Sequence, residues 1–163
     1  FDAVLTWATE YNPAFAKRLA DNKDYITAIL NIERNIGKKS RKDIVKWSDV
    51  ENDIAYFFDD TFTCDLSAFT EELHISVDEM KAIAQEFKAV YSKDDDKNMW
   101  FGKIKEIAEK HGFATDMKAY RENPSAFKGS ISDVANVLRI CITGRTQSPD
   151  LYQIMQLLGA SRL

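Results

Sequence analysis

The spacing of apolar residues constrains the fold of this chain more than any other feature of its sequence. Apolar side chains recur three and four residues apart through most of the 163 residues, which is the period of one face of an α-helix. The six glycines and three prolines are few, and no alternating run is long enough to predict a strand. We therefore predict an all-α fold made of two packed helical lobes.

The most regular helical pair lies between Ser130 and Gly159. We expect the first helix to end at Gly144, because glycine adopts the left-handed conformation common at helix C-termini. Ser148-Pro149-Asp150 predicts the start of the second helix, since serine caps free N–H groups and proline is tolerated at the first helical position. Arg139 and Arg145 flank the joining turn, and we interpret this charged turn as a binding edge.

The same spacing predicts further helices before this pair. They cover 1–9, 13–19, a segment from Asn22 to near Gly37, a helix capped by Ser48, a short helix or link at 66–73, a helix from the Ser76–Glu79 capping box to Val90, and one from Trp100 to Gly112. The helical pattern fails between residues 59 and 65. We accordingly divide the chain into a first lobe at residues 1–72 and a second lobe at residues 73–163.

Charge is unevenly distributed along the chain. The net charge is −4, which provides no global positive field for nucleic acid. Residues 34–46 nevertheless carry six positive side chains and one negative, and Trp47 follows them. Cations beside an aromatic ring suit single-stranded nucleic acid. The alternative is a solvated loop with Trp47 in the core, and spacing alone favours neither interpretation.

Catalytic and metal-binding signals are weak. His74 and His111 are the only histidines, no Cys–His cluster has zinc spacing, and no glycine-rich phosphate loop is present. Asp94–Asp96 lies in a predicted turn, where we expect it to be solvated, and Cys64 and Cys141 read as reduced core thiols. We predict no catalytic residue, metal or cofactor in this chain.

The first residue, Phe1, lies inside a predicted helix. We therefore expect the chain to be part of a longer protein whose catalytic domain lies upstream. No signal peptide and no long apolar run is visible, so the default expectation is a cytoplasmic protein without a membrane segment.

Several segments resemble bacterial glutamyl-tRNA synthetases, which are class I aminoacyl-tRNA synthetases. Segments similar to the signature near the C-terminus of that family are Leu138–Gly144, Ser148–Leu151 and Leu157–Gly159. Segments similar to the region after its stem-contact part are Ile29–Arg34, Arg41–Asp43 and Lys46–Val50, and Thr6–Ala8 also fits. The segments follow the family's order, so the resemblance covers nearly the whole chain.

The resemblance implies a C-terminal anticodon-binding region, a helical bundle or cage that grips the anticodon loop of a glutamate tRNA. The implied parent is a monomeric glutamate–tRNA ligase that uses ATP and Mg²⁺ in an upstream catalytic domain. The resemblance implies that Arg139, Ser148, Pro149 and Leu151 lie at the anticodon bases and that Arg41 lies near the third of them. From their place in the two charged segments, we predict that Thr143, Gly144, Arg145, Lys42 and Lys46 also bind tRNA, and that Lys38, Lys39 and Lys128 contact phosphates. The resemblance leaves open whether the parent also charges a glutamine tRNA.

Two other hypotheses stand beside this one. The chain could be a helical protein-interaction module with no RNA role, or a small helical enzyme, which the missing site chemistry disfavours. Arg139 also has a second interpretation, as a brace between the two helices that flank the turn.

Overall fold

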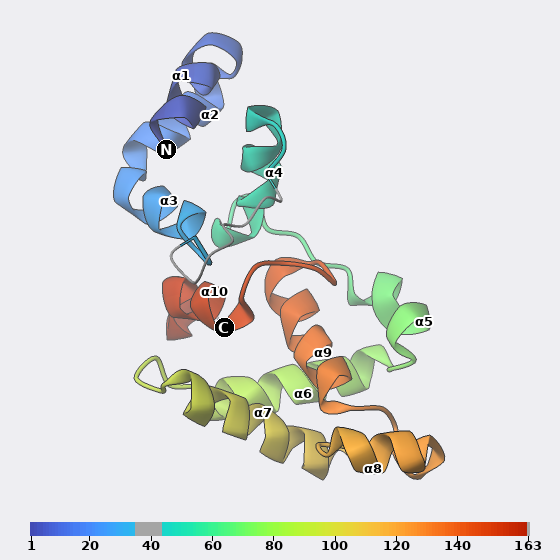
Figure 1. The fold of residues 1–163 in the computed structure, drawn as a ribbon. Helices are drawn as coiled ribbons and strands as arrows, with labels where there is room; N and C mark the ends of the chain where they lie inside the picture. Colours follow the sequence, from blue (N-terminus) through green and yellow to red (C-terminus); the bar gives the residue numbers. More distant parts are fainter. Residues whose placement is uncertain (35–43, 163) are drawn as a thin grey trace. The chain divides into compact units, whose positions relative to one another are not determined.

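The computed structural model describes residues 1–34 and 44–162, which form two compact units. Unit 1 contains Phe1–Phe62 and Pro149–Leu157, and unit 2 contains Thr63–Ser148 and the residues from Leu158. Figure 1 follows the helices along the chain. No strand occurs in the described residues, only an isolated bridge between Ala114 and Ser130, so the predicted all-α fold is confirmed. The division into domains at 1–72 and 73–163 stays a prediction.

Unit 1 holds the helices at both ends of the chain. They are α1 (Asp2–Tyr11), α2 (Pro13–Asp21), α3 (Lys23–Leu30), α4 (Val50–Asp53) and all but the last residue of α10 (Leu151–Leu158), with the 3-10 helices η1 (Trp47–Asp49) and η2 (Ala55–Phe57). The chain thus returns to unit 1 after the long helices of unit 2, which the sequence did not predict.

The first two helices of unit 1 pack against each other, and Figure 1 shows them side by side. Asn12 separates them and caps α2, accepting a hydrogen bond from the N–H of Phe15 at 3.1 Å. The Asn12 amide also donates to Glu51 at 2.8 Å, which ties α4 to the junction. The core of this pair is apolar and fully buried, with Ala8, Phe15 and Leu19 at 0–1% exposure.

Two predicted helices of unit 1 are shorter than their patterns suggested. The segment from Asn22 was expected to stay helical to near Gly37, but α3 ends at Leu30. Glu33 adopts a positive φ of 59°, a left-handed conformation that no helix continues through. The helix predicted to begin after Ser48 is also shorter than expected, because α4 covers only Val50–Asp53. Ser48 lies inside η1 instead of capping a helix, and its hydroxyl donates to Asp49.

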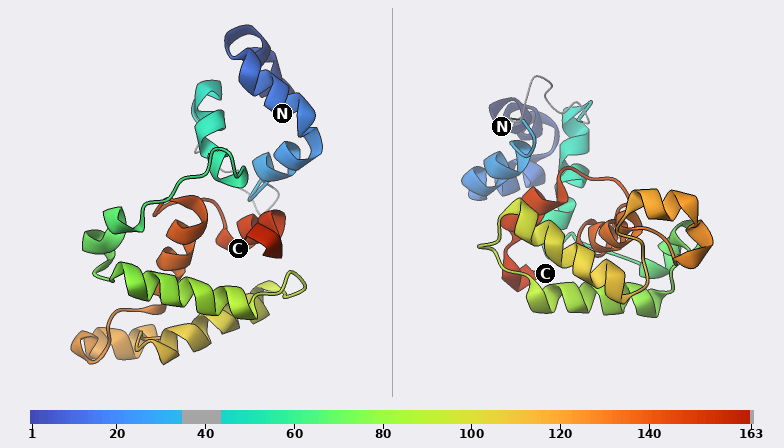
Figure 2. Two further views of the ribbon diagram at one scale, coloured as in Figure 1. Left: turned by 180° about the vertical axis from the view of Figure 1, so that it is seen from behind. Right: turned by 60° about the horizontal axis from the view of Figure 1, so that its bottom comes forward.

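Unit 2 is built on three longer helices. Its elements are η3 (Leu66–Phe69), α5 (Thr70–Leu73), α6 (Val77–Val90), α7 (Lys97–Lys110), α8 (Met117–Glu122), η4 (Pro124–Ala126), α9 (Ile131–Thr143) and η5 (Ala160–Arg162). Figure 2 shows α6 and α7 running side by side, and both contact α9. Met80, Ile83, Ile104, Val134 and Val137 are fully buried between them. Burying such apolar side chains is the main stabilising term of a helical fold.

Side chains cap the long helices of unit 2. Ser76 accepts a hydrogen bond from the N–H of Glu79 at 3.2 Å, which confirms the predicted start of α6. Asp96 caps α7 through the N–H groups of Asn98 and Met99, at 2.9 and 2.8 Å. Ser130 and Asp133 form a reciprocal capping box at the start of α9. Each such cap stabilises a helix by about 1 kcal/mol.

We expect the Asp94–Asp96 run to be solvated, and for Asp95 this prediction is wrong. Asp95 is only 6% exposed and forms an ion pair with Lys103 of α7. Because a buried carboxylate is costly without a partner, the lysine allows this turn to pack closely. The run therefore has a structural role, one residue as a buried charge and the next as a helix cap.

In the described part of the chain, no helix combines the length and apolar character that a membrane crossing requires.

Candidate nucleic-acid interface

The turn after α9 lies in unit 2 and is closed by hydrogen bonds within the protein. Gly144 ends the helix with φ of 67°, which confirms the predicted left-handed C-terminus. The Thr143 hydroxyl donates to the carbonyl of Arg139 at 2.8 Å and accepts from the N–H of Arg145 at 3.2 Å. Thr143 is 3% exposed. It therefore supports the turn from inside instead of forming part of its surface.

Arg139 fixes the far end of the same turn. Its Nη1 donates to the Ser148 hydroxyl at 2.5 Å and to the Ser148 carbonyl at 3.1 Å. Hydrogen bonds from a charged donor are about twice as strong as neutral ones. The structure thus brings Arg139 and Ser148 together, and it gives Arg139 a bracing contact. Arg145 and Ser148 are both partly exposed, within a turn of fixed conformation.

The start of α10 differs from the prediction. We expected Ser148 to cap this helix with Pro149 at its first position, but α10 begins at Leu151. The cap is Asp150, whose carboxylate accepts from the N–H of Gln153 at 3.0 Å. Ser148 lies two residues before this cap, and its hydroxyl accepts a hydrogen bond from Arg139.

Glu33 is a residue of this region that sequence reasoning missed. Its carboxylate accepts from the N–H of Asp150 at 3.0 Å, and its own N–H donates to the side chain of Gln153 at 3.3 Å. Both bonds lie within unit 1 and attach the start of α10 to the turn after α3. Glu33 belongs to the segment Ile29–Arg34, which resembles the ligases, and these hydrogen bonds give it a structural role.

Leu151 and Pro149 follow the turn in the chain and belong to unit 1. The Leu151 side chain is 4% exposed, whereas Pro149 is partly exposed. Leu151 is therefore a buried residue at the start of α10. A direct contact between Leu151 and a base stays a prediction.

Of the predicted basic loop, Lys46 is the residue that the structure describes. Lys38, Lys39, Arg41 and Lys42 lie outside the described residues. Lys46 is exposed in extended backbone, so its ammonium group can reach an anion in solution.

Trp47 follows Lys46 and is 46% exposed, so the interpretation that placed it in the core is wrong.

Lys128 has a partner within unit 2. Its ammonium group donates to Glu79 at 2.5 Å, and Glu79 also lies 3.5 Å from Nδ1 of His111. Nε2 of the same ring lies 3.4 Å from Glu86 of α6. Lys128 thus links α6 to the chain before α9, and the His111 ring lies beside both glutamates of α6. A phosphate contact by Lys128 would compete with Glu79.

The titratable groups of unit 2 indicate structural roles. The ammonium of Lys110, hydrogen-bonded to Glu86, holds the pKa of that carboxyl below its usual range. Burial raises the pKa of the Cys141 thiol to about 11, with a smaller contribution from Cys64. Since the thiolate is the nucleophile, Cys141 is poorly suited to covalent catalysis. Among the described residues, no three metal-binding side chains come together.

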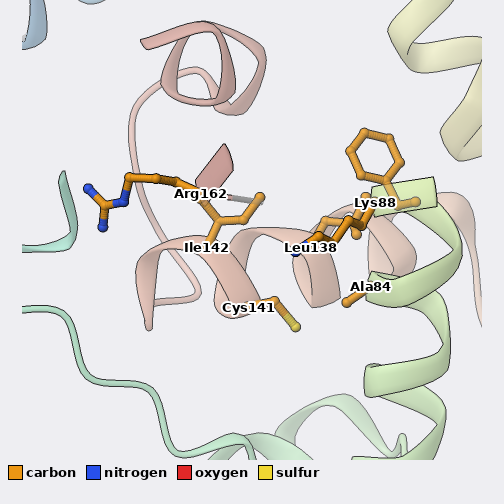
Figure 3. Close-up of a pocket in the computed structure, with 7 residues that line it drawn as sticks. Ala84, Lys88, Leu138, Cys141, Ile142 and Arg162 are labelled. Atoms are coloured by element: carbon orange, nitrogen blue, oxygen red, sulfur yellow. The ribbon is translucent and has the colours of Figure 1, made fainter. Parts of the chain in front are cut away.

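A small cavity of about 70 Å³ lies between α6, α9 and η5 in unit 2. Figure 3 shows Ala84 and Lys88 from α6 opposite Leu138 and Cys141 from α9. Ligand pockets usually have volumes of about 300–1,000 Å³. This cavity is too small to hold a substrate.

Known proteins resemble the chain over nearly its whole length. Residues 117–163 match the model of the anticodon binding domain. The chain is 36% identical over 160 residues to a glutamate–tRNA ligase of Clostridium perfringens (strain 13 / Type A), which covers 98% of the chain and 29% of that relative. It is also 36% identical over 165 residues to the ligase of Acetivibrio thermocellus, covering 100% of the chain and 29% of the relative.

A more distant ligase, from Sorangium cellulosum, is 32% identical over 160 residues, covering 98% of the chain and 28% of the relative. The chain thus spans less than a third of the length of these relatives. No solved structure matches it.

These matches confirm the resemblance to glutamate–tRNA ligases. The chain is therefore homologous over nearly its whole length to the C-terminal part of glutamate–tRNA ligases, and its residues 117–163 match the anticodon binding domain.

Proposed function

We propose that this chain recognises the anticodon loop of a glutamate tRNA, as the anticodon-binding part of a glutamate–tRNA ligase. The observation that carries the proposal is the match of nearly the whole chain to such ligases, together with the anticodon-binding domain at residues 117–163. The hydrogen-bonded turn after α9 supports it, because a preorganised turn loses little conformational entropy when it binds.

In this proposal, Arg139 acts as a positioning residue as well as a cation near the RNA. By holding Ser148 through its hydroxyl and carbonyl, it fixes the segment that presents Arg145 and Pro149. Sequence-specific RNA recognition targets unpaired bases through stacking and hydrogen bonds to their edges. A fixed turn that carries arginine, serine and proline offers a cation, a hydroxyl and a flat apolar surface for this purpose.

The basic residues 38–46 supply the phosphate contacts in the same proposal. Lys38, Lys39, Arg41, Lys42 and Lys46 follow one another in a short segment, and contacts of this kind position an RNA without reading its sequence. We place Arg41 near the third anticodon base. Titration with a glutamine tRNA measures whether this segment accepts that tRNA as well.

The parent enzyme, in this proposal, is a cytoplasmic monomer that attaches glutamate to tRNA. ATP and Mg²⁺ belong to its catalytic domain, and this chain binds no cofactor of its own.

Titration with tRNA tests the proposal. Binding of a glutamate tRNA transcript is measured at two salt concentrations, beside transcripts of a glutamine tRNA and of glutamate tRNA with altered anticodon bases. We expect affinity to fall steeply with salt, since phosphate contacts release counterions, and to fall further when anticodon bases are changed. Equal affinity for all transcripts would contradict the proposal, and would favour a protein-interaction module.

A further inference from the structure

A groove of about 510 Å³ lies in unit 1 beside the basic segment. Its lining residues are Trp7, Ile44, Val45, Lys46, Trp47 and Ser48. We call it the indole groove, because two of the three tryptophans of the chain line it. Its volume is within the range of ordinary ligand sites, about 300–1,000 Å³.

The two walls of the indole groove come from different parts of unit 1 and are held in place. Trp7 projects from α1, whose buried residues are Val4 and Ala8, and its ring stacks on that of Tyr11 with centroids 5.9 Å apart. The other wall is the segment that leads into η1, which packs against α1. The hydrogen bond from Asn12 to Glu51 fixes the helix that follows η1. The helices that carry Trp7 and Trp47 are therefore held against each other before a ligand arrives.

Two apolar side chains of this groove are unusually exposed for their type. Val45 is 80% exposed and Trp47 is 46% exposed. Clustered apolar side chains on a surface mark interaction sites in soluble proteins, and a tryptophan loses few rotamers when it binds. The groove thus has the character of a contact surface.

Charge indicates which kind of ligand the groove takes. Lys46 lines it, none of its lining residues is acidic, and residues 34–46 carry six positive side chains against one negative. Aromatic rings that hold a base beside cations that follow the backbone are the usual design of single-strand sites. An apolar protein segment would gain nothing from this concentration of positive charge.

We propose that the indole groove binds an unpaired nucleotide of the tRNA, with Trp47 stacking on its base and Lys46 contacting an adjoining phosphate. The identification of the RNA as tRNA rests on the proposed function, whereas the stacking itself depends only on the groove. The contact would add affinity without reading the base, because every base has a π-face.

Trp47→Ala tests the stacking in the chain as it stands. We expect the Kd for glutamate tRNA to rise about five- to a hundredfold, the range found when a stacking ring is removed. The slope of log Kd against log salt should stay the same, because the ring carries no charge. Trp47→Phe should retain most of the affinity, since phenylalanine also stacks. Phe101→Ala is the matched control, because Phe101 is equally exposed, at 46%, on α7 of unit 2. An affinity of Trp47→Ala within twofold of the parent chain would overturn the proposal.

Fluorescence of the unmodified chain gives a second measurement that does not depend on the variants folding. A single-stranded hexauridylate should quench the indole emission, and a blunt RNA duplex of the same length should quench it much less, because its bases are already stacked. Equal quenching by both, or none, would overturn the stacking proposal. If tRNA binding ignores the anticodon but hexauridylate still quenches, the proposed function fails and the groove proposal stands. If changed anticodon bases lower the affinity but neither Trp47→Ala nor hexauridylate has an effect, the proposed function stands and the groove proposal fails.

Discussion

The turn after α9 and the indole groove are both expected to meet RNA, but they are built in opposite ways. The turn's polar groups are hydrogen-bonded inside the protein, with Arg139 on Ser148 and Thr143 on Arg145. The groove presents large side chains, Trp47 and Val45, that no core covers. A closed turn is suited to discrimination, because rigid groups cannot adapt to a wrong base. An open groove is suited to sequence-tolerant affinity.

Thiol reactivity offers the largest measurable contrast between the two regions. Cys141 lies on α9 just before the closed turn, and burial raises the pKa of its thiol to about 11. A solvated cysteine has a pKa near 8.5. At pH 8, Cys141 should therefore hold roughly a hundredfold less thiolate than a cysteine introduced into the groove by Ser48→Cys, where the native side chain is exposed.

Alkylation with iodoacetamide at pH 8 measures the reaction rates of position 48 and Cys141 in one variant. Peptide mass spectrometry distinguishes these two cysteines from Cys64. The native Cys141 then serves as the internal reference for position 48. Similar rates at positions 48 and 141 would contradict the distinction between open and closed regions.

Arg139→Ala should have the next largest effect, because it removes two charge-assisted hydrogen bonds from the turn. Such bonds contribute about 1.5–3 kcal/mol each to stability, and a similar loss of about 1–3 kcal/mol is expected in tRNA binding, with relaxed base preference. Urea unfolding and tRNA titration measure the two quantities.

Ser148→Ala separates the roles of Arg139. It removes the hydroxyl partner at 2.5 Å and keeps the cation. If Arg139 acts by positioning the turn, Ser148→Ala should relax base preference as well. Unchanged preference in Arg139→Ala would leave it only a bracing role.

Alanine substitutions at two glycines should change the free energy of unfolding by smaller amounts and in opposite directions. Gly144 has φ of 67° at the end of α9, and an L-residue in the left-handed region costs about 1–2 kcal/mol. Gly102 lies inside α7, and an added Cβ there meets nothing within 4 Å. Gly144→Ala should therefore lower the free energy of unfolding, whereas Gly102→Ala should raise it by about 0.5–1 kcal/mol. Thermal denaturation distinguishes the two, and stabilisation by Gly144→Ala would show that the turn is not held in that conformation.

What could be predicted from sequence follows from how local each interaction is. The cap at Ser76 and the left-handed Gly144 depend on residues within one helical turn, and both were predicted correctly. The end of α3 was not, because the positive φ of Glu33 goes with its bonds to Asp150 and Gln153, more than a hundred residues away. Asp95 is similar, since its burial depends on Lys103.

The candidate site shows the same limit. Arg139 and Ser148 were identified together, yet the sequence could not show that they bond to each other and leave the capping of α10 to Asp150. For Trp47, exposed and buried positions were equally compatible with its spacing. Its place on the surface depends on η1 lying against α1, a contact between segments forty residues apart. No local sequence pattern indicates that Trp7 and Trp47 line the same groove.

Lys46→Ala should produce the smallest change in stability. Its effect on the salt dependence of tRNA affinity tests whether the indole groove and the turn after α9 bind RNA in different ways. Lys46 is exposed, and substitutions at such positions usually change the free energy of unfolding by less than about 0.5 kcal/mol. If its ammonium contacts a phosphate, all tRNAs should bind more weakly to the same degree, and the salt slope should fall by about one. Lys17→Ala is a matched control in the same unit, because Lys17 is also exposed and pairs with Asp21 on α2. A selective loss for one anticodon in Lys46→Ala would mean that the open region reads sequence, and the division of labour between groove and turn would then be wrong.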